Sequence, residues 1–189
     1  MPKLTKDFYL RDDVVQISKE LLGKYLLTKF NGKLTGGIIT ETEAYAGITD
    51  KASHAYGNRR TNRTEVMYHE GGKAYIYLCY GIHSLFNIVT NKKDIPDAVL
   101  IRAIKPTEGI DIMMKRRNKK THNLISGPGT VAQALGMNTI HSGLDLCGNK
   151  IWLEDNGTNT SNEIITSTRI GVSYAEEDAL LPYRFHLKL

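Results

Sequence analysis

Cysteine is scarce in this sequence, and its scarcity excludes several classes of protein. The 189 residues include two cysteines, Cys79 and Cys147, which lie far apart and form no Cys-x-x-Cys pair. Disulfide scaffolds and cysteine-rich zinc sites need more cysteines at closer spacing, so we expect neither, and we expect a reducing compartment. His69 and Glu70 begin like a zincin motif, but position 73 holds lysine where that motif needs a second histidine.

Long apolar runs are also missing. No stretch approaches the roughly 18 apolar residues that indicate a transmembrane helix. Residues 1–10 have no apolar core of the kind found in a signal peptide. We therefore expect a cytoplasmic protein with no membrane partner. Repeats and linkers are absent as well, and the length suits a single domain over residues 1–189.

The sequence has an excess of positive charge and an excess of tyrosine over the other aromatic residues. The formal net charge is +5, which favours nucleic-acid binding without establishing it. Ten tyrosines stand against four phenylalanines and one tryptophan. Because tyrosine both stacks and hydrogen-bonds, the excess fits a polar site lined by aromatic rings. Half-buried strands would account for the tyrosines equally well.

The stretch from Ile38 to Tyr45 favours a strand, because isoleucine and threonine are β-branched. Side chains alternate between the faces of a strand, so Ile39, Glu41 and Glu43 would share one face. Tyr45 follows on the same parity. Repulsion between the two carboxylates, or burial, would raise one pKa into the range of a general acid or base. The alternative is that both glutamates are solvated or salt-bridged.

Turn and cap signals surround this stretch. Asp12 or Asp13 can cap a short helix that Gly23 ends, and Asn31-Gly32 predicts a hairpin turn. We expect strands at 24–30, 33–45, 73–80, 84–90, 98–104, 150–154, 163–170 and 182–187, and helices that begin at 106–108 and at 130. The pattern predicts an α+β fold whose curved, mainly antiparallel sheet carries a protruding β-hairpin and surrounding helices.

Two polar features, Arg102 and the segment 115–120, have alternative explanations. Arg102 interrupts an apolar strand, where it either pairs with a carboxylate or phosphate or faces water from an edge. The basic segment 115–120 is either a solvated helix end or a patch that contacts phosphate. Residues 156–162 are expected to form a polar turn. The basic loop with Arg59, Arg60 and Arg63 suits contacts to a DNA backbone.

Several short motifs occur in order through nearly the whole chain. They are Glu41-Thr42-Glu43-Ala44-Tyr45, Ala52-Ser53-His54, Tyr75-Ile76-Tyr77-Leu78-Cys79-Tyr80-Gly81, Phe86-Asn87-Ile88, Leu100-Ile101-Arg102-Ala103, Ser126-Gly127-Pro128 and Arg169-Ile170-Gly171-Val172. Each motif alone is weak, but together they resemble the alkyladenine (3-methyladenine) DNA glycosylase family. The sequence departs from better-known members at Ile82-His83, and we expect a member without the long N-terminal extension of the mammalian proteins.

This resemblance implies a base-excision repair enzyme that needs no metal or other cofactor. It would flip damaged purines, such as 3-methyladenine, 7-methylguanine, hypoxanthine and ethenoadenine, out of double-stranded DNA and hydrolyse the N-glycosidic bond. We expect a monomer that is nucleoid-associated in a bacterium. The Glu43 motif contains no lysine, so strand nicking through a Schiff base is not expected; the nearby Lys51 is the one candidate for it.

The resemblance also implies a role for individual residues. Glu43 would activate water, and Arg102 would lie near the backbone of the flipped nucleotide. The base pocket would comprise Ala52, Tyr45, His54, Tyr77 and Asn87, with Asn87 as the gate against normal guanine. Tyr80 would fill the gap that the flipped nucleotide leaves in the duplex.

Two alternatives to a glycosylase are also compatible with a basic, tyrosine-rich surface. One is a non-catalytic nucleic-acid-binding module, and the other is a hydrolase of small nucleosides. A module that only binds has no use for the Glu43 carboxylate among phosphates. The basic loop and the tyrosine at a hairpin tip argue against a small-molecule substrate.

Overall fold

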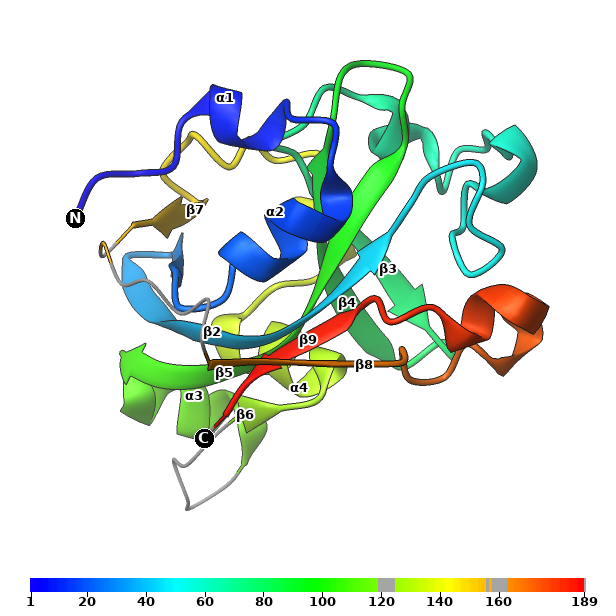
Figure 1. The fold of residues 1–189 in the computed structure, drawn as a ribbon. Coiled ribbons are helices and arrows are strands. Elements are labelled where there is room, and N and C mark those ends of the chain that lie inside the picture. Colours follow the sequence, from blue (N-terminus) through cyan, green and yellow to red (C-terminus); the bar gives the residue numbers. More distant parts are fainter. Residues whose placement is uncertain (119–124, 156, 158–162, 189) are drawn as a thin grey trace.

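Nine strands form one open sheet in the computed structural model, which describes residues 1–118, 125–155, 157 and 163–188 (Figure 1). The strands are β1 (Tyr25–Phe30), β2 (Lys33–Tyr45), β3 (Ala74–Cys79), β4 (His83–Thr90), β5 (Asp97–Glu108), β6 (Ile125–Ser126), β7 (Ile151–Glu154), β8 (Ile164–Ser167) and β9 (Arg184–Leu187). Their order is β3-β4-β5-β2-β1-β7, while β6 pairs with β5 and β9 pairs with both β2 and β8. These pairings are antiparallel.

Short helices pack around the sheet and complete the predicted α+β architecture. They are α1 (Lys6–Tyr9), α2 (Val14–Glu20), α3 (Ile110–Arg117) and α4 (Pro128–Leu135), with the 3-10 helices η1 (Tyr56–Asn58), η2 (Glu65–Tyr68), η3 (Thr139–His141) and η5 (Ser173–Leu180). Helix α2 contacts β2 and β5, and α4 contacts β4 and β5. In Figure 1, α2 lies across the sheet, whereas η5 lies beside the long loop that follows β2.

Strand β2 occupies the centre of the sheet because it pairs with β1, β5 and β9. It spans the predicted residues 33–45, and the Asn31-Gly32 turn joins it to β1 as expected. The expected bulge or close approach at Gly36-Gly37 is confirmed. The register with β5 shifts there, and a Cβ atom on Gly37 would lie 2.5 Å from the carbonyl oxygen of Lys105.

Two further register shifts flank Glu41. The β2–β5 pairs are Ile39 with Ile104, Glu41 with Ala103 and Thr42 with Ile101. One residue of each strand, Thr40 on β2 and Arg102 on β5, is thus passed over in the pairing. Such irregularities re-aim side chains, and they break the simple alternation that the sequence predicted from Ile39 onwards. Ile39 packs in the main hydrophobic core, whereas Glu41 and Glu43 both contact Arg102.

The predicted start of a helix at Pro106 is wrong. Residues 106–108 extend β5, with Gly37 opposite Pro106 and Gly36 opposite Glu108. Helix α3 begins at Ile110, after Gly109 in the left-handed conformation (φ 63°). Proline and glutamate are typical of a helix start, but pairing with the central strand outweighed that local preference. Asp13, by contrast, caps α2 as predicted by accepting the amide of Gln16 at 2.8 Å.

Other predicted elements differ mainly in their ends. The strand expected at 163–170 is shorter and ends at Ser167, and α4 begins two residues earlier than position 130. Residues 119–120 of the basic segment, and 156 and 158–162 of the polar turn, lie outside the described residues. In the described part of the chain, no helix is long and apolar enough to cross a membrane.

Two buried threonines on β2 make different contacts. The hydroxyl of Thr42 donates to the carbonyl oxygen of Ser18 at 2.9 Å and accepts from the Ser18 hydroxyl at 3.0 Å, which ties β2 to α2. The hydroxyl of Thr40 is buried and has no hydrogen-bond partner within the described residues.

These contacts predict different costs for the same substitution. Thr42→Val should lower the free energy of unfolding by about 1–2 kcal/mol, because it removes a bonded hydroxyl and leaves Ser18 groups without their partner. Thr40→Val should leave the stability unchanged or raise it, because the lost hydroxyl has no bond to lose. Urea unfolding of both variants measures this difference. Equal losses would show that the contact between Ser18 and Thr42 contributes little.

Candidate active site

A pocket lies between the end of β2, the loop after it, the β3–β4 hairpin and η5. Its lining residues come from these elements, from η2 and from β5. They are Tyr45, Ala52, Ser53, His54, Met67, Tyr75, Tyr77, Asn87, Ala98 and Tyr174. All five residues that the sequence predicted for a base pocket thus line this one pocket.

Aromatic rings form one side of this pocket. Nδ1 of His54 lies 3.0 Å from the hydroxyl oxygen of Tyr75, and the His54 and Tyr77 rings meet edge to face at a centroid distance of 4.5 Å. Tyr75 and Tyr77 share a face of β3, as predicted, with their centroids 5.5 Å apart. The guanidinium of Arg63 lies 5.1 Å from the centroid of the Tyr77 ring. The arrangement offers flat, electron-rich surfaces to a ligand.

His54 is neutral near pH 7. Burial lowers the pKa of its imidazole to about 4, and the positive charges of Arg63 and Arg59 act in the same direction. A neutral imidazole carries one donor and one acceptor nitrogen, so His54 can hydrogen-bond to a ligand without bringing a charge into the pocket. A cationic ligand would therefore meet no repulsion from this residue.

Asn87 and Ala52 are held in place through their polar groups. The Asn87 side-chain amide donates to the carbonyl oxygen of Tyr75 at 3.2 Å. The amide of Ala52 donates to a carboxylate oxygen of Asp50 at 3.0 Å, and its carbonyl oxygen accepts from the Tyr174 hydroxyl at 3.1 Å. Groups that hydrogen bonds hold in place give a pocket a definite shape.

Glu43 lies behind the pocket and is fully buried. One carboxylate oxygen accepts the Tyr45 hydroxyl at 2.8 Å, and the other accepts the backbone amide of Ile170 at 2.8 Å. Nη1 of Arg102 lies 3.4 Å from this second oxygen. Tyr45 is itself a lining residue, so it connects the carboxylate to the pocket.

Burial raises the pKa of the Glu43 carboxyl above its ordinary value of 4.5. The charge of Arg102 and the hydrogen bonds from Ile170 and Tyr45 act in the opposite direction but do not cancel the effect of burial. Burial raises the pKa of Tyr45, and the charge of Glu43 raises it further, so this hydroxyl keeps its proton and donates a hydrogen bond to the carboxylate. A buried carboxylate with a raised pKa is typical of general acids and bases.

Glu41 has a different environment from Glu43. One of its oxygens accepts from Nε of Arg102 at 2.9 Å and from Nε of Arg184 at 2.6 Å. Burial alone would raise the pKa of Glu41, but the hydrogen bonds and charges of the two arginines lower it below 4.5. The salt-bridged alternative therefore holds for Glu41, and Arg102 pairs with carboxylates instead of facing water from a sheet edge.

Tyr80 stands at the tip of the β3–β4 hairpin, outside the pocket. Its side chain is 89% exposed, and the neighbouring Ile82 is 74% exposed. Tyr80 has a φ of 51°, and Gly81 follows at 71°. A bulky residue in the left-handed region stores strain of about 1 kcal/mol or more, which is common where function requires a particular side-chain direction.

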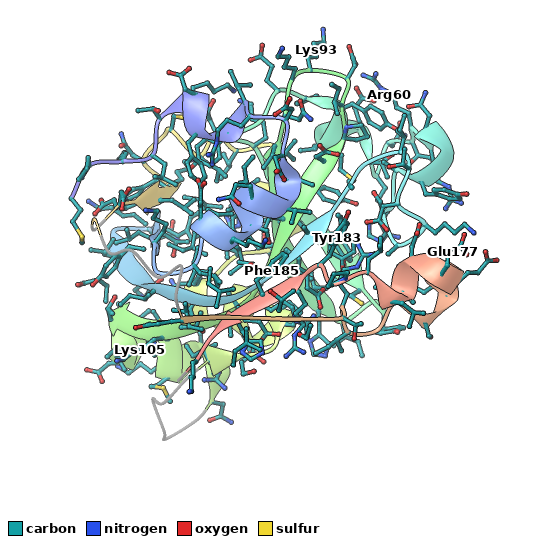
Figure 2. The ribbon with its side chains drawn as sticks, viewed as in Figure 1. Arg60, Lys93, Lys105, Glu177, Tyr183 and Phe185 are labelled. Carbon is teal, nitrogen blue, oxygen red and sulfur yellow. The ribbon has the colours of Figure 1, made fainter. Side chains whose placement is uncertain are left out.

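The three arginines of the basic loop do not share one environment. Arg60, labelled in Figure 2, forms ion pairs with Glu65 at 2.6 Å and with Asp94 at 2.8 Å. Arg59 and Arg63 are exposed, and neither forms an ion pair within the part of the chain that the structure describes. Two of the three predicted backbone contacts are thus free to meet an anion, and the third already has carboxylate partners.

Lys51 is bound away from the pocket. Its ammonium pairs with Glu176 and with Glu177 at 2.8 Å, both on η5. Figure 2 labels Glu177, which lies at the edge of the molecule. Among the described residues, no group of three or more histidine, cysteine, aspartate or glutamate side chains is arranged to hold a metal ion.

Residues 7–189 match the family described as Methylpurine-DNA glycosylase (MPG). The chain belongs to this family. A protein of Chlamydia felis is 50% identical over 98% of this chain and 96% of its own length, and one of Clostridium novyi is 44% identical over 100% and 96%. Both carry the name "Putative 3-methyladenine DNA glycosylase".

Family membership makes this chain an enzyme of DNA repair, a glycosylase that acts on DNA. It confirms the resemblance drawn from the motifs. Sequence reasoning nevertheless missed two groups next to Glu43. The amide of Ile170 and the ion pair of Arg169 with Asp50 surround the carboxylate region. The motif at 169–172 contained both Arg169 and Ile170, but nothing local indicated which residues they contact.

The opposite pKa shifts of the two glutamates predict opposite effects of pH on stability. The pKa of Glu43 is raised by folding, so its contribution to the free energy of unfolding is present below pH 4.5 and is lost as the pH rises through the raised value. The pKa of Glu41 is lowered, so its contribution is present above pH 4.5 and is lost as the pH falls through the lowered value.

Unfolding of the wild type, Glu43→Gln and Glu41→Gln proteins between pH 3 and 7 measures both effects. As the pH rises, the wild type should lose stability relative to Glu43→Gln and gain stability relative to Glu41→Gln. The two variants act as controls for each other. Differences of the same sign would contradict the environments described for these two carboxylates.

Proposed function

We propose that this enzyme is a monofunctional glycosylase that flips damaged purines out of double-stranded DNA and hydrolyses the N-glycosidic bond. The observation that carries the proposal is the pairing of a fully buried carboxylate, Glu43, with a tyrosine-lined pocket through the 2.8 Å bond to Tyr45. A base within a duplex cannot reach such a pocket, so it must leave the stack.

The pocket suits electron-poor purines. Tyr45, Tyr75 and Tyr77 present ring surfaces, and cations are attracted to the faces of aromatic rings. The neutral His54 adds a hydrogen-bonding edge without a charge. We therefore propose 3-methyladenine and 7-methylguanine as cationic substrates, and hypoxanthine and ethenoadenine as neutral ones. Asn87 would exclude normal guanine by its fixed position beside the base.

Glu43 is the general base in this proposal. Its ionised form accepts a proton from a water molecule while the water oxygen attacks C1′ of the sugar. The bond from C1′ to the base nitrogen breaks, and its electron pair leaves with the base. The sugar passes through an oxocarbenium-like state that a nearby carboxylate stabilises. Each carboxylate oxygen has two acceptor sites, so the single bond from Tyr45 leaves one site on its oxygen that can accept from water.

Arg102 keeps this carboxylate ionised. Its charge opposes the effect of burial on the pKa of Glu43, and we propose that it also lies near the backbone of the flipped nucleotide. It is fixed for that task by its bond to Glu41.

The exposed residues around the pocket would hold the DNA. Tyr80 would enter the stack and replace the flipped nucleotide, which offsets part of the lost stacking. Arg59 and Arg63 would contact phosphates on the free side of the loop. Arg60 would reach a phosphate only by leaving Glu65 or Asp94. We propose that the enzyme acts as a monomer in the cytoplasm, associated with the nucleoid.

Hydrolysis without strand nicking fits the surroundings of Glu43. A Schiff base needs an amine at C1′, and the lysine closest in sequence, Lys51, is paired with Glu176 and Glu177. A water molecule therefore serves as the nucleophile in this proposal.

Glu43→Gln tests the proposed general base. The variant should bind lesion DNA about as well as the wild type but excise the base at least ~100-fold more slowly in single turnover, which is typical of a lost general base. Glu41→Gln is the matched control, because it changes a neighbouring carboxylate of the same strand. If Glu41→Gln is inactive and Glu43→Gln is active, the catalytic register is wrong.

Substrate charge should decide the pH profile. A methylated purine is already cationic and leaves without a proton, so its single-turnover rate should rise with pH to a plateau as Glu43 ionises. A neutral base leaves poorly as an anion and also needs a proton. Its profile should have the same acidic limb and an added basic limb, measured with hypoxanthine in an otherwise identical duplex.

His54 does not provide that proton. With a pKa of about 4, its imidazole is already neutral in the range where the rates are measured. We propose a pocket hydroxyl or a water molecule as the donor. A bell-shaped profile for every substrate, or for none, would show that substrate charge does not decide the mechanism.

A further inference from the structure

Arg169 and Asp50 form a buried ion pair beside the candidate active site. Their side chains are 0% and 1% exposed. Both guanidinium Nη atoms bond to the carboxylate, with Nη1 to Oδ2 at 2.5 Å and Nη2 to Oδ1 at 2.9 Å. The two residues lie 119 positions apart in the chain, so the pair joins the loop after β2 to the segment before η5.

Stability alone accounts poorly for this pair. Removing two charges from water is costly, and buried ion pairs often contribute no more to folding than apolar residues of similar volume. Nε of Arg169 is also buried and has no hydrogen-bond partner among the described residues. A buried donor without a partner is destabilising, so its presence calls for an explanation other than stability.

The Arg169 side of the pair fixes the two hydrogen-bond donors of the Glu43 carboxylate, Ile170 and Tyr45. The next residue in the chain, Ile170, donates its amide to one Glu43 oxygen. The Arg169 guanidinium lies 4.8 Å from the centroid of the Tyr45 ring, whose hydroxyl bonds to the other oxygen. Nη1 of Arg169 also donates at 2.9 Å to the carbonyl oxygen of Ala44, the residue between Glu43 and Tyr45.

The Asp50 side of the pair fixes the pocket wall. One Asp50 oxygen accepts the amide of Ala46 at 3.1 Å, and the other accepts the amide of Ala52 at 3.0 Å. Asp50 thus holds both ends of the turn from Ala46 to Ala52, which leads from β2 into the pocket. Nη2 of Arg169 adds a bond at 3.0 Å to the carbonyl oxygen of Asp178 in η5.

We propose that Arg169 and Asp50 are positioning residues, which hold the Glu43 carboxylate and the pocket wall in one fixed arrangement. The inference rests on the proposed role of Glu43 as the general base. Neither residue is proposed to touch the substrate or the reacting water. They act through Ile170, Tyr45 and Ala52. Their contacts fix the geometry of the site, although burying their charges is costly.

A positioning role has a consequence for the ionisation of Glu43. The titratable and charged groups around this carboxylate are Arg102, Glu41, Tyr45 and Arg169. The hydrogen bonds from Ile170 and Tyr45 oppose the effect of burial on its pKa. If the support of these two donors is loosened, their bonds lengthen and the carboxylate becomes harder to ionise. The acidic limb of the rate profile should then move to higher pH.

Arg169→Lys is the test, because it keeps the charge but loses the two-pronged contact to Asp50. Single-turnover excision of 7-methylguanine is measured against pH at saturating enzyme, with rates corrected for the folded fraction. We expect the plateau rate to fall on the order of 10- to 100-fold, as small misplacements of catalytic groups do, and the acidic limb to shift upward. Affinity for undamaged DNA should not change.

Arg116→Lys is the matched control. Arg116 is a partly buried arginine that donates to the Thr35 hydroxyl at 3.0 Å and to the carbonyl oxygen of Ala134 at 2.9 Å. It lies by Thr35, eight residues before Glu43 on β2, which is about 26 Å along a strand. This variant should lose stability but keep the wild-type acidic limb and plateau rate.

Asp50→Asn provides a second, milder change and applies if Arg169→Lys does not fold. It should lower the plateau rate as Arg169→Lys does, whereas the position of the acidic limb is compared only for Arg169→Lys, because the lost charge of Asp50 by itself lowers the pKa of Glu43. A wild-type plateau in a folded variant of either residue would overturn the proposal, as would an upward shift of the acidic limb in Arg116→Lys.

Failure of this inference can be told apart from failure of the proposed function. If Glu43→Gln is inactive while the Arg169 and Asp50 variants have wild-type profiles, Glu43 is the base but the pair does not position it. If Glu43→Gln is active, the proposed general base is wrong and the positioning role falls with it.

Discussion

Burial of the Glu43 carboxylate is the constraint on which the site depends. A charge removed from water costs several kcal/mol unless other groups replace the lost hydration. Ile170, Tyr45 and Arg102 supply that replacement from three separate segments. Their contacts do not cancel the cost, because the pKa of the carboxyl stays above its ordinary value. In the proposed mechanism, the remaining cost makes Glu43 useful as a base, since a fully satisfied carboxylate has little tendency to accept a proton.

The sheet makes this burial possible. Strand β2 lies between β5 and β9, so both edges of its backbone are paired and its side chains near Glu43 are shielded from water. The register shifts around Glu41 aim Arg102 at the two glutamates. Glu41 then takes the second arginine, Arg184, and stays ionised. Two carboxylates of one strand thus differ in character because one receives arginine hydrogen bonds and the other does not.

The surface that would contact DNA differs from the pocket in exposure and in charge. The pocket contains a neutral imidazole and tyrosines whose phenols keep their protons, which suits a flat, electron-poor ligand. Outside it, the strained and exposed Tyr80 stands clear of the core. The loop arginines divide into Arg60, which has carboxylate partners, and Arg59 and Arg63, which have none among the described residues. In the proposed function, recognition of the base and recognition of the duplex would therefore use separate groups.

The sequence by itself determined the local elements and the membership of the pocket. The hairpin turn at Asn31-Gly32, the cap at Asp13 and the span of β2 follow from preferences of neighbouring residues, which act over a few positions. The residues predicted for the base pocket line one pocket, but their selection came from the resemblance to the family and not from local preferences. Local preference failed at Pro106, where pairing with β2 extended a strand through an expected helix start.

Only the tertiary structure decided which partner each charged group has. Arg102 had two open alternatives, and the choice between them depended on the register of β5 against β2. The bond from Ile170 to Glu43 spans 127 positions, and the ion pair between Arg169 and Asp50 spans 119. Periodicity and spacing describe residues that are near in sequence, so they contain no signal for contacts of this range. Such contacts form only when the whole sheet brings distant segments together, because the energy of a charge depends on its surroundings in space.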